Sequence, residues 1–368
     1  MKKINLAVIF GGKSDEHEVS LSSAQSIIKA LDKKKYNVIP IAITKKGNWL
    51  LGTKGKKYLE LNSQAAGKEN ALSIEQSQSL VAISESERNL INYAEGESDK
   101  KIDLVLPILH GPYGEDGRLQ GMLDMLGVAY VFSGVLSHAL GMHKLKAKMM
   151  AQSAGVPVAP SVAIKKNQKY QLDKIIKQLK LPLVVKPMEL GSSVGISISK
   201  TKKDLVQDIQ KAFEYDHEIL LEKYIKGREF TATVIEEQEK PTSLPIIEII
   251  PQISEFYDYK AKYEDGGSKH VCPACLSKSK TKIMQDYAIK VFEVIGCHDL
   301  ARVDFVSDQK ENFYFIDLNT IPGMTKTSLA PEAARASGIN FDLFLDKIIE
   351  NALNRQSSKK VPDIEVLK

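Results

Sequence analysis

Short apolar runs separated by helical spacing predict a parallel sheet at the start of the chain. Residues 4–10 form such a run before a Gly-Gly pair, residues 20–31 have helical periodicity, and residues 38–43 form a second run. This β-loop-α-β order is typical of a doubly wound sheet. A third buried strand is expected at 102–109, ending in His110. Open α/β sheets bind ligands at the carboxyl ends of their strands, so we expect a site there.

The sequence predicts the structure of the next two segments with different clarity: the first is weakly patterned and the second clearly helical. Residues 45–98 are polar and weakly patterned, and we interpret them as an insertion with a hairpin that pairs 58–61 with 80–83. Residues 137–154 have the spacing of one long helix. A glycine and then a proline follow this helix, which is a strong stop signal.

Two further lobes are predicted after the first, which gives lobes at residues 1–137, 138–224 and 225–368. The central lobe has a βαβ-like pattern, with strands near 160–164, 183–186, 195–199 and 218–222 and helices from 171 and at 202–214. The third lobe has β-rich segments at 229–236 and 244–250, a polar aromatic stretch at 252–275, a helix at 278–295 and a hairpin at 300–319. The predicted fold class is therefore mixed α/β.

Composition and charge narrow the class of protein. The chain has 368 residues, of which 43% are hydrophobic and 26% charged, which excludes a disordered chain, a collagen-like repeat and a coiled coil. The net charge of +5 is spread over short lysine clusters. A dedicated nucleic-acid binder usually concentrates its charge, so we expect no nucleic-acid partner and favour small anionic ligands.

Cysteine usage and hydropathy predict a cytoplasmic protein. Three cysteines are too few for a disulfide scaffold, and the pair Cys272 and Cys275 lacks the second pair or the histidine of a zinc site. No apolar stretch approaches the roughly 18 residues that a membrane span requires. We therefore expect no membrane insertion.

A Gly/Ser loop at residues 190–195 follows a strand that ends in Lys186. Glycines let the backbone approach a phosphate closely, and serine hydroxyls can donate to its oxygens. A lysine at the end of a buried strand needs an anionic partner. The sequence favours a phosphate site, with a hairpin turn beside a solvent-reaching lysine as the alternative.

The hairpin at 300–319 carries the strongest local argument. We expect Val303 and Phe305 to share the apolar face with Ile316 and Leu318, so the numbers of paired residues sum to an odd value such as 621. The polar face is then formed by Arg302, Asp304, Asp317 and Asn319. Two carboxylates and an amide oxygen suit Mg²⁺, and the arginine could stabilise a developing oxyanion. A solvent-facing hairpin with paired charges is the alternative.

The loop after this hairpin, 320–325, contains a Pro-Gly turn and leads to hydroxyl residues up to Ser328. Backbone N–H groups in such turns often bind carboxylates or phosphates. A plain turn before the next helix is the alternative.

Seven motifs in a fixed order resemble the D-alanine–D-alanine ligase family of the ATP-grasp superfamily. They are EHEVS at 16–20, HGPYGEDG at 110–117, KP at 186–187 with GSSVG at 191–195, GREFT at 227–231, YDYKAKY at 257–263, ARVD at 301–304 and NTIPGMT at 319–325. The resemblance implies a three-lobed ATP-grasp fold. It also implies a reaction in which ATP phosphorylates one D-alanine and the amine of a second attacks the acylphosphate. ATP and two Mg²⁺ or Mn²⁺ ions are the implied cofactors, and a homodimer the implied assembly.

The same resemblance implies a role for particular residues by matching position. Glu16 would hold the ammonium of the first substrate and hydrogen-bond through Ser192 to Tyr263, with His110 near the substrate carboxylate. Arg302 and the N–H of Gly323 would stabilise the oxyanion. The second substrate's carboxylate would lie at Ser328 and Leu329.

For the nucleotide, the resemblance implies phosphate contacts, an adenine hinge and a ribose contact. The phosphate contacts would come from Lys144, Lys186, Ser193 and Lys262, the hinge from Glu222, Lys223, Tyr224 and Ile225, and the ribose contact from Glu229. The metal ligands would be Asp304, Asp317 and Asn319. The stretch 252–275 would be a lid that excludes water from the acylphosphate.

Two positions depart from the family pattern. Asp317 stands where glutamate is usual, and His143 precedes Lys144 where aspartate is common. Three other functions stay open: a D-alanine–D-lactate ligase, another ATP-grasp carboxylate–amine ligase, and a non-catalytic nucleotide-binding regulator. Tyr263 argues against the first, because D-lactate-using relatives commonly have Phe or His at that position.

Overall fold

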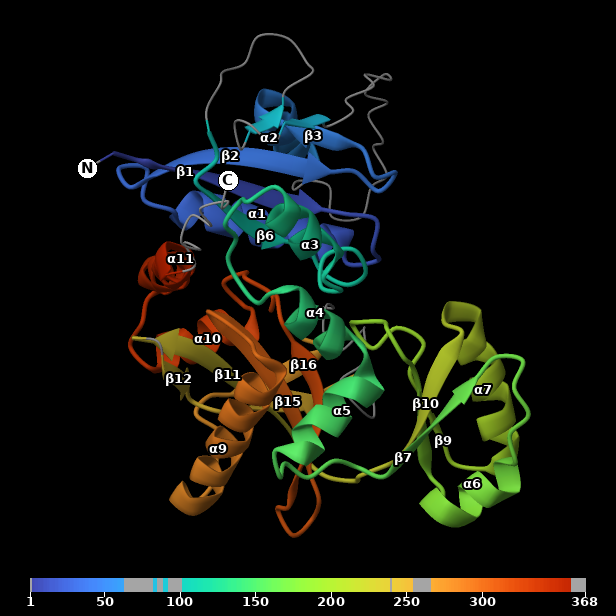
Figure 1. The fold of residues 1–368 in the computed structure, drawn as a ribbon. Coiled ribbons are helices and arrows are strands. Elements are labelled where there is room, and N and C mark those ends of the chain that lie inside the picture. The colour runs from blue at the N-terminus through green and yellow to red at the C-terminus, as the bar shows by residue number, and fades with distance from the viewer. Residues whose placement is uncertain are drawn as a thin grey trace, which may run out of the picture.

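The computed structural model describes residues 2–62, 82–84, 89–91, 101–238, 240–253 and 266–358. Three larger sheets each form the centre of one lobe. In Figure 1 the N-terminal lobe lies at the top, the central lobe at the lower right and the C-terminal lobe at the lower left. The predicted three-lobed α/β architecture is confirmed.

A mostly parallel sheet forms the N-terminal lobe. Its elements are β1 (Ile4–Gly11), α1 (His17–Ala30), β2 (Tyr36–Ile43), β3 (Trp49–Leu51), α2 (Gly52–Asn62), β4 (Ala82–Ser84), β5 (Asn89–Ile91), β6 (Leu104–Ile108) and α3 (Arg118–Met125). The sheet order is β3-β2-β1-β6, with β1, β2 and β6 parallel and β3 an antiparallel edge. The six residues 6–11 of β1 are all buried, as expected of a central strand covered on both faces.

The hairpin predicted within residues 45–98 is wrong. Tyr58 lies in α2, where Gly55 and Leu59 form a buried face at helical spacing, and its hydroxyl is 3.2 Å from His17 Nε2. β4 pairs with β5 instead. Residues 80 and 81 of the expected second arm lie outside the described residues.

The central lobe is an antiparallel sheet with two helices. Its elements are β7 (Ser161–Lys165), α6 (Leu172–Leu179), β8 (Leu183–Pro187), β9 (Ser197–Ser199), α7 (Lys202–Tyr215) and β10 (Glu218–Lys223). The predicted elements are present, but the order β7-β10-β8-β9 is antiparallel throughout, so the βαβ-like spacing does not produce a parallel sheet here. A capping box between Thr201 and Asp204 begins α7.

The single helix predicted at 137–154 is two helices, α4 (Val135–Met142) and α5 (Lys144–Ser153). The chain is extended at His143, which breaks the helix between them, and the His143 Nδ1 accepts a hydrogen bond from the Lys146 N–H at 3.4 Å. His143 therefore caps α5, the task that an aspartate performs well at this position. The apolar periodicity continues across the break, which is why the sequence pattern did not reveal it.

The C-terminal lobe is built on a second antiparallel sheet. Its elements are β11 (Glu229–Glu237), β12 (Lys240–Ser243), β13 (Ile247–Pro251), β14 (Ser268–Val271), α9 (Lys278–Ile295), β15 (Leu300–Ser307), β16 (Phe313–Asn319), α10 (Leu329–Ala336) and α11 (Phe341–Ser358). The strand order is β14-β13-β11-β15-β16, with β12 paired to β11. One core joins α9 to β11, β15 and β16, and Ala147 and Ala151 of α5 are part of it.

The β15–β16 hairpin has the predicted register only up to a bulge. Arg302 pairs with Asn319 and Asp304 with Asp317, which are sums of 621. After Asp304 the register shifts by one, and Phe305 pairs with Phe315. The expectation that Ile316 faces the core is therefore wrong. Two phenylalanines, Phe313 and Phe315, take the buried side, because burying aromatic area is worth more than burying one isoleucine.

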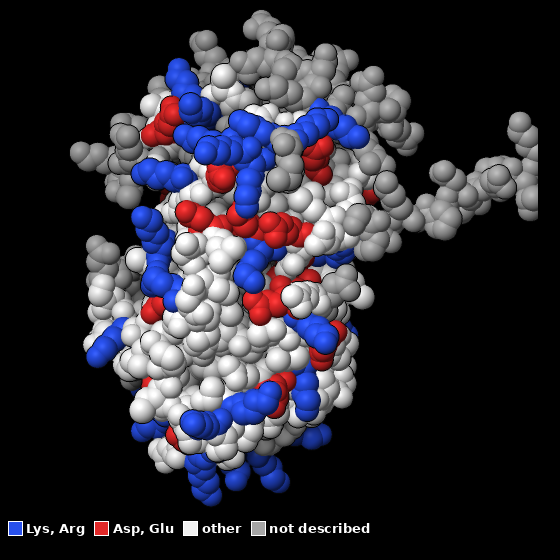
Figure 2. Space-filling model, turned by 90° about the vertical axis from the view of Figure 1, so that its left-hand side faces the viewer, with Lys and Arg blue, Asp and Glu red and all other residues white. Residues whose placement is uncertain are grey.

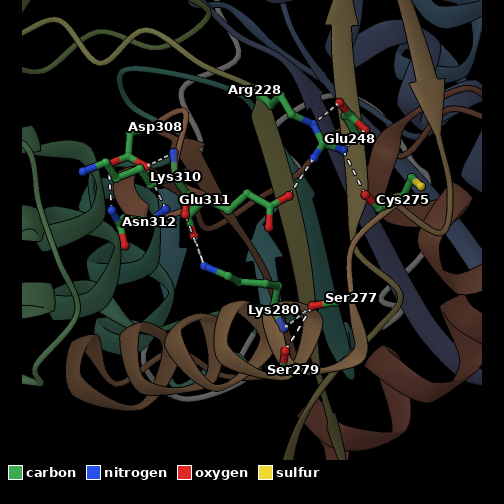
Figure 3. A network of polar contacts seen from close by, with 10 residues as sticks. All are labelled: Arg228, Glu248, Cys275, Ser277, Ser279, Lys280, Asp308, Lys310, Glu311 and Asn312. Carbon is green, nitrogen blue, oxygen red and sulfur yellow. Dashed lines mark hydrogen bonds and ion pairs between the residues drawn. The ribbon is translucent and has the colours of Figure 1, made fainter.

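The hairpin turn is fastened to neighbouring elements by a polar network (Figure 3). Arg228 donates to both carboxylate oxygens of Glu248 at 2.7 and 2.6 Å and contacts Glu311 at 3.4 Å. Lys280, in the first turn of α9, donates to the carbonyl of Glu311 at 2.7 Å. These contacts join the residue before β11, strand β13, α9 and the turn, so they fix the end of the hairpin remote from Arg302.

A partly buried arginine joins the last helix to the first lobe. Arg355 of α11 donates to the carbonyls of Tyr130 and Phe132, both at 3.0 Å, and forms an ion pair with Asp299. Asp299 also accepts from the Phe132 N–H at 2.7 Å. Burial raises the pKa of Asp299 to about 7, although Arg355 opposes this. The N-terminal and C-terminal lobes therefore share one polar junction.

Candidate active site

A cavity of about 150 Å³ lies between the central and C-terminal sheets. Most of the predicted nucleotide and metal residues line it: Lys144, Lys186, Ser193, Glu222, Tyr224, Ile225, Glu229, Asp304 and Asp317. The bulge explains one further lining residue, since it turns Ile316 from the core toward the cavity. Lys223 is exposed on β10 and is not among the lining residues. Lys262 lies outside the described residues.

Three charged groups are buried at the central-lobe wall of this cavity. Glu222 accepts from Lys186 at 3.0 Å through one carboxylate oxygen and from Lys148 through the other. Burial opposes ionisation of Glu222, but the two ammonium groups outweigh it and lower its pKa. The Glu222 side chain therefore belongs to this ion cluster, while the residue also lines the cavity together with Tyr224 and Ile225. Lys148 was not predicted from the sequence, although it follows Lys144 by four residues and so lies on the same face of α5.

The break before α5 places Lys144 at the cavity. The Lys144 N–H donates to the carbonyl of Met188 at 3.2 Å, and its Nζ donates to the carbonyl of Leu190. Both acceptors belong to the segment between Lys186 and the Gly/Ser loop. Lys144 therefore connects the N-terminus of α5 to the loop expected to cover phosphates.

The polar face of the β15–β16 hairpin forms the opposite wall. Arg302 donates through Nε and Nη2 to the two oxygens of Asp304, both at 3.0 Å. Asn319 Nδ2 donates to the same carboxylate at 3.0 Å, and the Thr231 hydroxyl at 2.5 Å. The sequence prediction that these hairpin residues share one face is confirmed. Asp304 is the centre around which the others are arranged.

The donor set on this wall fits a magnesium ion. Within the described residues, no three His, Cys, Asp or Glu side chains are grouped as a metal site. The hairpin instead pairs Asp304 directly with Asp317 and places Asn319 beside them. A pair of carboxylates with one amide oxygen leaves coordination positions for water and phosphate oxygens, which is the usual environment of Mg²⁺.

A second cavity, of about 230 Å³, lies between the N-terminal lobe and the Gly/Ser loop. Glu16, Ser14 and Gly191 are among its lining residues, and the Ser192 hydroxyl donates to Glu16. The Glu16–Ser192 contact expected from the sequence is therefore present. Tyr263, its expected third member, lies outside the described residues.

His110 is buried between the first and third lobes. Its Nδ1 lies 3.1 Å from the carbonyl of Ile321, and its Nε2 makes no hydrogen bond to any described residue. Burial lowers the pKa of His110, although Glu16 opposes this, so the imidazole is neutral at pH 7. A neutral imidazole carries one N–H, and the Ile321 carbonyl can only accept, so the proton lies on Nδ1 and Nε2 is an acceptor.

Gly323 and Ser328 lie together in the loop before α10. The Ser328 hydroxyl accepts from the Thr325 N–H at 3.0 Å and is 2.7 Å from the Thr325 hydroxyl. A Cβ at Gly323 would lie 2.9 Å from Ser328 Oγ, which no real side chain tolerates without movement. Ser328 is the N-cap residue of α10 and Leu329 its first residue, so the first backbone N–H groups of the helix have no acceptor within the helix itself.

Glu115 joins two of these loops and was missed by the sequence analysis. Its Oε2 accepts from the Gly111 N–H and its Oε1 from the Ile321 N–H, both at 2.9 Å. Burial, assisted by the nearby Glu16 carboxylate, raises the pKa of Glu115 to about 8. The sequence indicated Glu115 only as one residue of the motif at 110–117. A carboxylate that bridges segments 206 residues apart cannot be found from local pattern.

Glu115→Gln should change how stability depends on pH. Because the folded-state pKa of Glu115 is about 8 and its ordinary value is 4.5, the folded chain binds more protons between these values. Its contribution to stability is therefore complete below pH 4.5 and is lost as pH rises toward 8, with a slope of up to about 1.4 kcal/mol per pH unit. Melting temperatures from pH 5 to 8 should fall less steeply for Glu115→Gln than for wild type. The exposed-residue control Glu60→Gln should keep the wild-type slope, and an equal slope in Glu115→Gln would contradict the assignment.

Comparisons with known proteins identify the family. The family model described as D-ala D-ala ligase N-terminus matches residues 5–133, and the model described as D-ala D-ala ligase C-terminus matches 150–350. The D-alanine–D-alanine ligase of Natranaerobius thermophilus is 42% identical over 366 residues, covering 98% of this chain and 97% of that protein.

Solved structures with a similar fold are also described as ligases of D-alanine. The VanG D-Ala:D-Ser ligase of Enterococcus faecalis is 32% identical with a TM-score of 0.80, covering 95% of this chain and 100% of that one. The ATP complex of the Bacillus anthracis D-alanine–D-alanine ligase is 28% identical with a TM-score of 0.71, covering 96% and 99%. In the described parts of the chain, no helix combines the length and apolar character that a membrane span needs. On sequence and fold, the chain belongs to the D-alanine–D-alanine ligase family of ATP-grasp enzymes.

Proposed function

We propose that the protein joins two D-alanine molecules with ATP, and so supplies the dipeptide for peptidoglycan precursors. The single observation that carries the proposal is the cavity with lysines on its central-lobe wall and the Asp304–Asp317 pair on the opposite wall. Phosphoryl transfer needs mostly positioning and charge neutralisation, and such a cavity can supply both.

The proposed reaction has two steps. A carboxylate oxygen of the first D-alanine attacks the terminal phosphorus of ATP, and the bond from that phosphorus to ADP breaks. The amine of the second D-alanine then attacks the acyl carbon of D-alanyl phosphate. Phosphate leaves, the amine loses a proton, and the products are D-alanyl-D-alanine, ADP and phosphate.

We assign the nucleotide contacts to residues that line the first cavity. Lys144, Lys186 and Ser193 contact the phosphates, Tyr224 and Ile225 flank the base, and Glu229 binds the ribose. Asp304, Asp317 and Asn319 hold two Mg²⁺ or Mn²⁺ ions, which neutralise phosphate charge when bound. Of the lid predicted at 252–275, Ser268–Val271 instead form strand β14 of the C-terminal sheet, so that part of the prediction is wrong. The lid role stays a proposal for residues 254–265, with Lys262 and Tyr263 in their sequence-based roles.

The substrate roles use the contacts around the second cavity. Glu16, held by Ser192, binds the ammonium of the first D-alanine, and His110 lies near the carboxylate of the same substrate. Arg302 and the Gly323 N–H stabilise the tetrahedral oxyanion. The N-terminus of α10 at Ser328 and Leu329 binds the carboxylate of the second D-alanine.

Assembly and compartment are part of the proposal. Val135 packs beside Gly121 of α3, and Met125 follows Gly121 by one helical turn, so the exposed Met125, Val135 and Leu136 form one apolar surface. We assign this surface to a homodimer in the cytoplasm. Sedimentation equilibrium tests the assembly, and a mass equal to one chain would overturn it. Basic and acidic side chains are interspersed over the face drawn in Figure 2, a pattern that does not favour a nucleic-acid partner.

Phosphate release from ATP, measured separately with D-alanine, L-alanine, D-lactate and D-serine, tests the function. D-alanine alone should support release and yield D-alanyl-D-alanine. L-alanine should not, and D-lactate or D-serine should add no mixed product when supplied with D-alanine. The D-serine arm is included because VanG, which is similar in structure, is named a D-Ala:D-Ser ligase. Absence of D-alanine-dependent release would overturn the proposed function.

A further inference from the structure

The buried cluster at the central-lobe wall contains two cations and one anion. Lys148 and Lys186 both contact Glu222, each at a different carboxylate oxygen. The three side chains are 3%, 9% and 5% exposed for Lys148, Lys186 and Glu222 respectively. One carboxylate therefore serves two buried ammonium groups, which leaves the cluster with one positive charge in excess.

The two lysines differ in their relation to the cavity. Lys186 lines it, together with Glu222, whereas Lys148 is on the inner side of α5 and is not among the lining residues. An anion that enters the cavity can therefore reach Lys186 and not Lys148. The excess positive charge of the cluster is therefore accessible at Lys186, where a phosphate in the cavity would lie.

Movement of Lys186 toward a phosphate would have a cost if Glu222 had no second partner. A buried carboxylate that loses its cation keeps its desolvation penalty without compensation. Lys148 removes this cost, because its ammonium stays on the other carboxylate oxygen. Burial lowers the pKa of Lys148 while Glu222 opposes this, so each of the two groups depends on the other for its charge.

We propose that Lys148 is a positioning residue for nucleotide binding, which keeps Glu222 paired when Lys186 turns from that carboxylate to a nucleotide phosphate. This inference rests on the proposed function, because the phosphate it invokes belongs to ATP or ADP. Lys148 itself does not touch the nucleotide. It acts through Glu222 and Lys186.

The main test is Lys148→Met, a substitution of similar length without charge. The variant should fold, because the remaining Glu222–Lys186 pair is balanced. Its dissociation constant for Mg-ADP, measured by calorimetry, should rise about tenfold, and its KM for ATP likewise, with KM for D-alanine unchanged. Lys146→Met is the matched control, because Lys146 is an exposed lysine of the same helix and should leave both constants unchanged.

Two further variants make the result specific. Lys148→Arg keeps the charge and should bind Mg-ADP nearly as wild type does. Lys148→Met combined with Glu222→Gln removes the carboxylate that would hold Lys186, so it should bind Mg-ADP more tightly than Lys148→Met alone.

The outcomes separate this inference from the proposed function. Wild-type affinity in Lys148→Met, failure of that variant to fold, or no recovery in the double variant would each overturn the role of Lys148 while wild type still binds nucleotide. Loss of Mg-ADP binding in the wild-type protein itself would overturn both.

Discussion

Arg302→Lys should lower kcat of the D-alanine-dependent reaction by about 10²–10³-fold, the usual effect of removing one oxyanion donor. Arg302 holds Asp304 through two parallel hydrogen bonds, both of 3.0 Å, which fix the plane of its guanidinium. Lysine keeps the positive charge but cannot make this fork, so its ammonium would not be held where the oxyanion forms. KM for ATP should change little, because Arg302 is not needed to bind the nucleotide.

Steady-state kinetics with D-alanine and ATP varied separately check this result. Arg228→Lys is the matched control, since Arg228 makes a comparable fork to Glu248 in the network of Figure 3, remote from the oxyanion. That control should lower the melting temperature with little change in kcat. Equal kcat values for Arg302→Lys and wild type would remove Arg302 from the catalytic set.

Asp317→Asn should lower kcat by about 10²-fold or more at fixed Mg²⁺, since a bound metal contributes several kcal/mol to phosphoryl transfer. Asp317 pairs directly with Asp304 across the hairpin, so the substitution removes one of the two carboxylates on this wall. The Mg²⁺ concentration at half-maximal rate should rise with it. Asp317→Glu, which restores the side chain usual in the family, should keep activity and reach half-maximal rate at no higher Mg²⁺.

Titration of the rate with Mg²⁺ checks the metal assignment. Asp308→Asn is the control on the same hairpin, because Asp308 lies in the turn and accepts hydrogen bonds from Lys310 and Asn312 there. It should leave the Mg²⁺ dependence unchanged. An unchanged Mg²⁺ dependence in Asp317→Asn would show that Asp317 does not bind the metal.

Alternation of polar and apolar residues predicted the polar face of the hairpin but not its bulge. Arg302, Asp304, Asp317 and Asn319 share a face because strand side chains alternate with period two. Phe313 and Phe315 have odd numbers and Leu318 an even one, so all three can be buried only if one residue is extra between them. A bulge supplies that residue. The conflict between odd-numbered and even-numbered buried positions is therefore already present in the sequence. Local alternation does not show which positions are buried, because that depends on the burial of the aromatic rings.

The remaining differences come from contacts between distant segments. The periodicity of 137–154 does not show that His143 is extended, because the break depends on the contact between Lys144 and Met188. Pairing of Glu222 with Lys148 and of Glu115 with Ile321 is likewise a property of the packed lobes. Local patterns predicted the elements and several site residues, whereas these partners required the tertiary arrangement.

The contact of Arg355 with Tyr130, Phe132 and Asp299 has a consequence for synthesis of the chain on the ribosome. The carbonyls at 130 and 132 are made early, but the side chain that satisfies them is translated more than two hundred residues later. The strands of the first lobe can pair as they leave the ribosome, but the junction with Arg355 can form only after α11 has been synthesised. Nascent chains that stop short of residue 355 would therefore carry an unfinished first lobe, which is a natural binding site for chaperones.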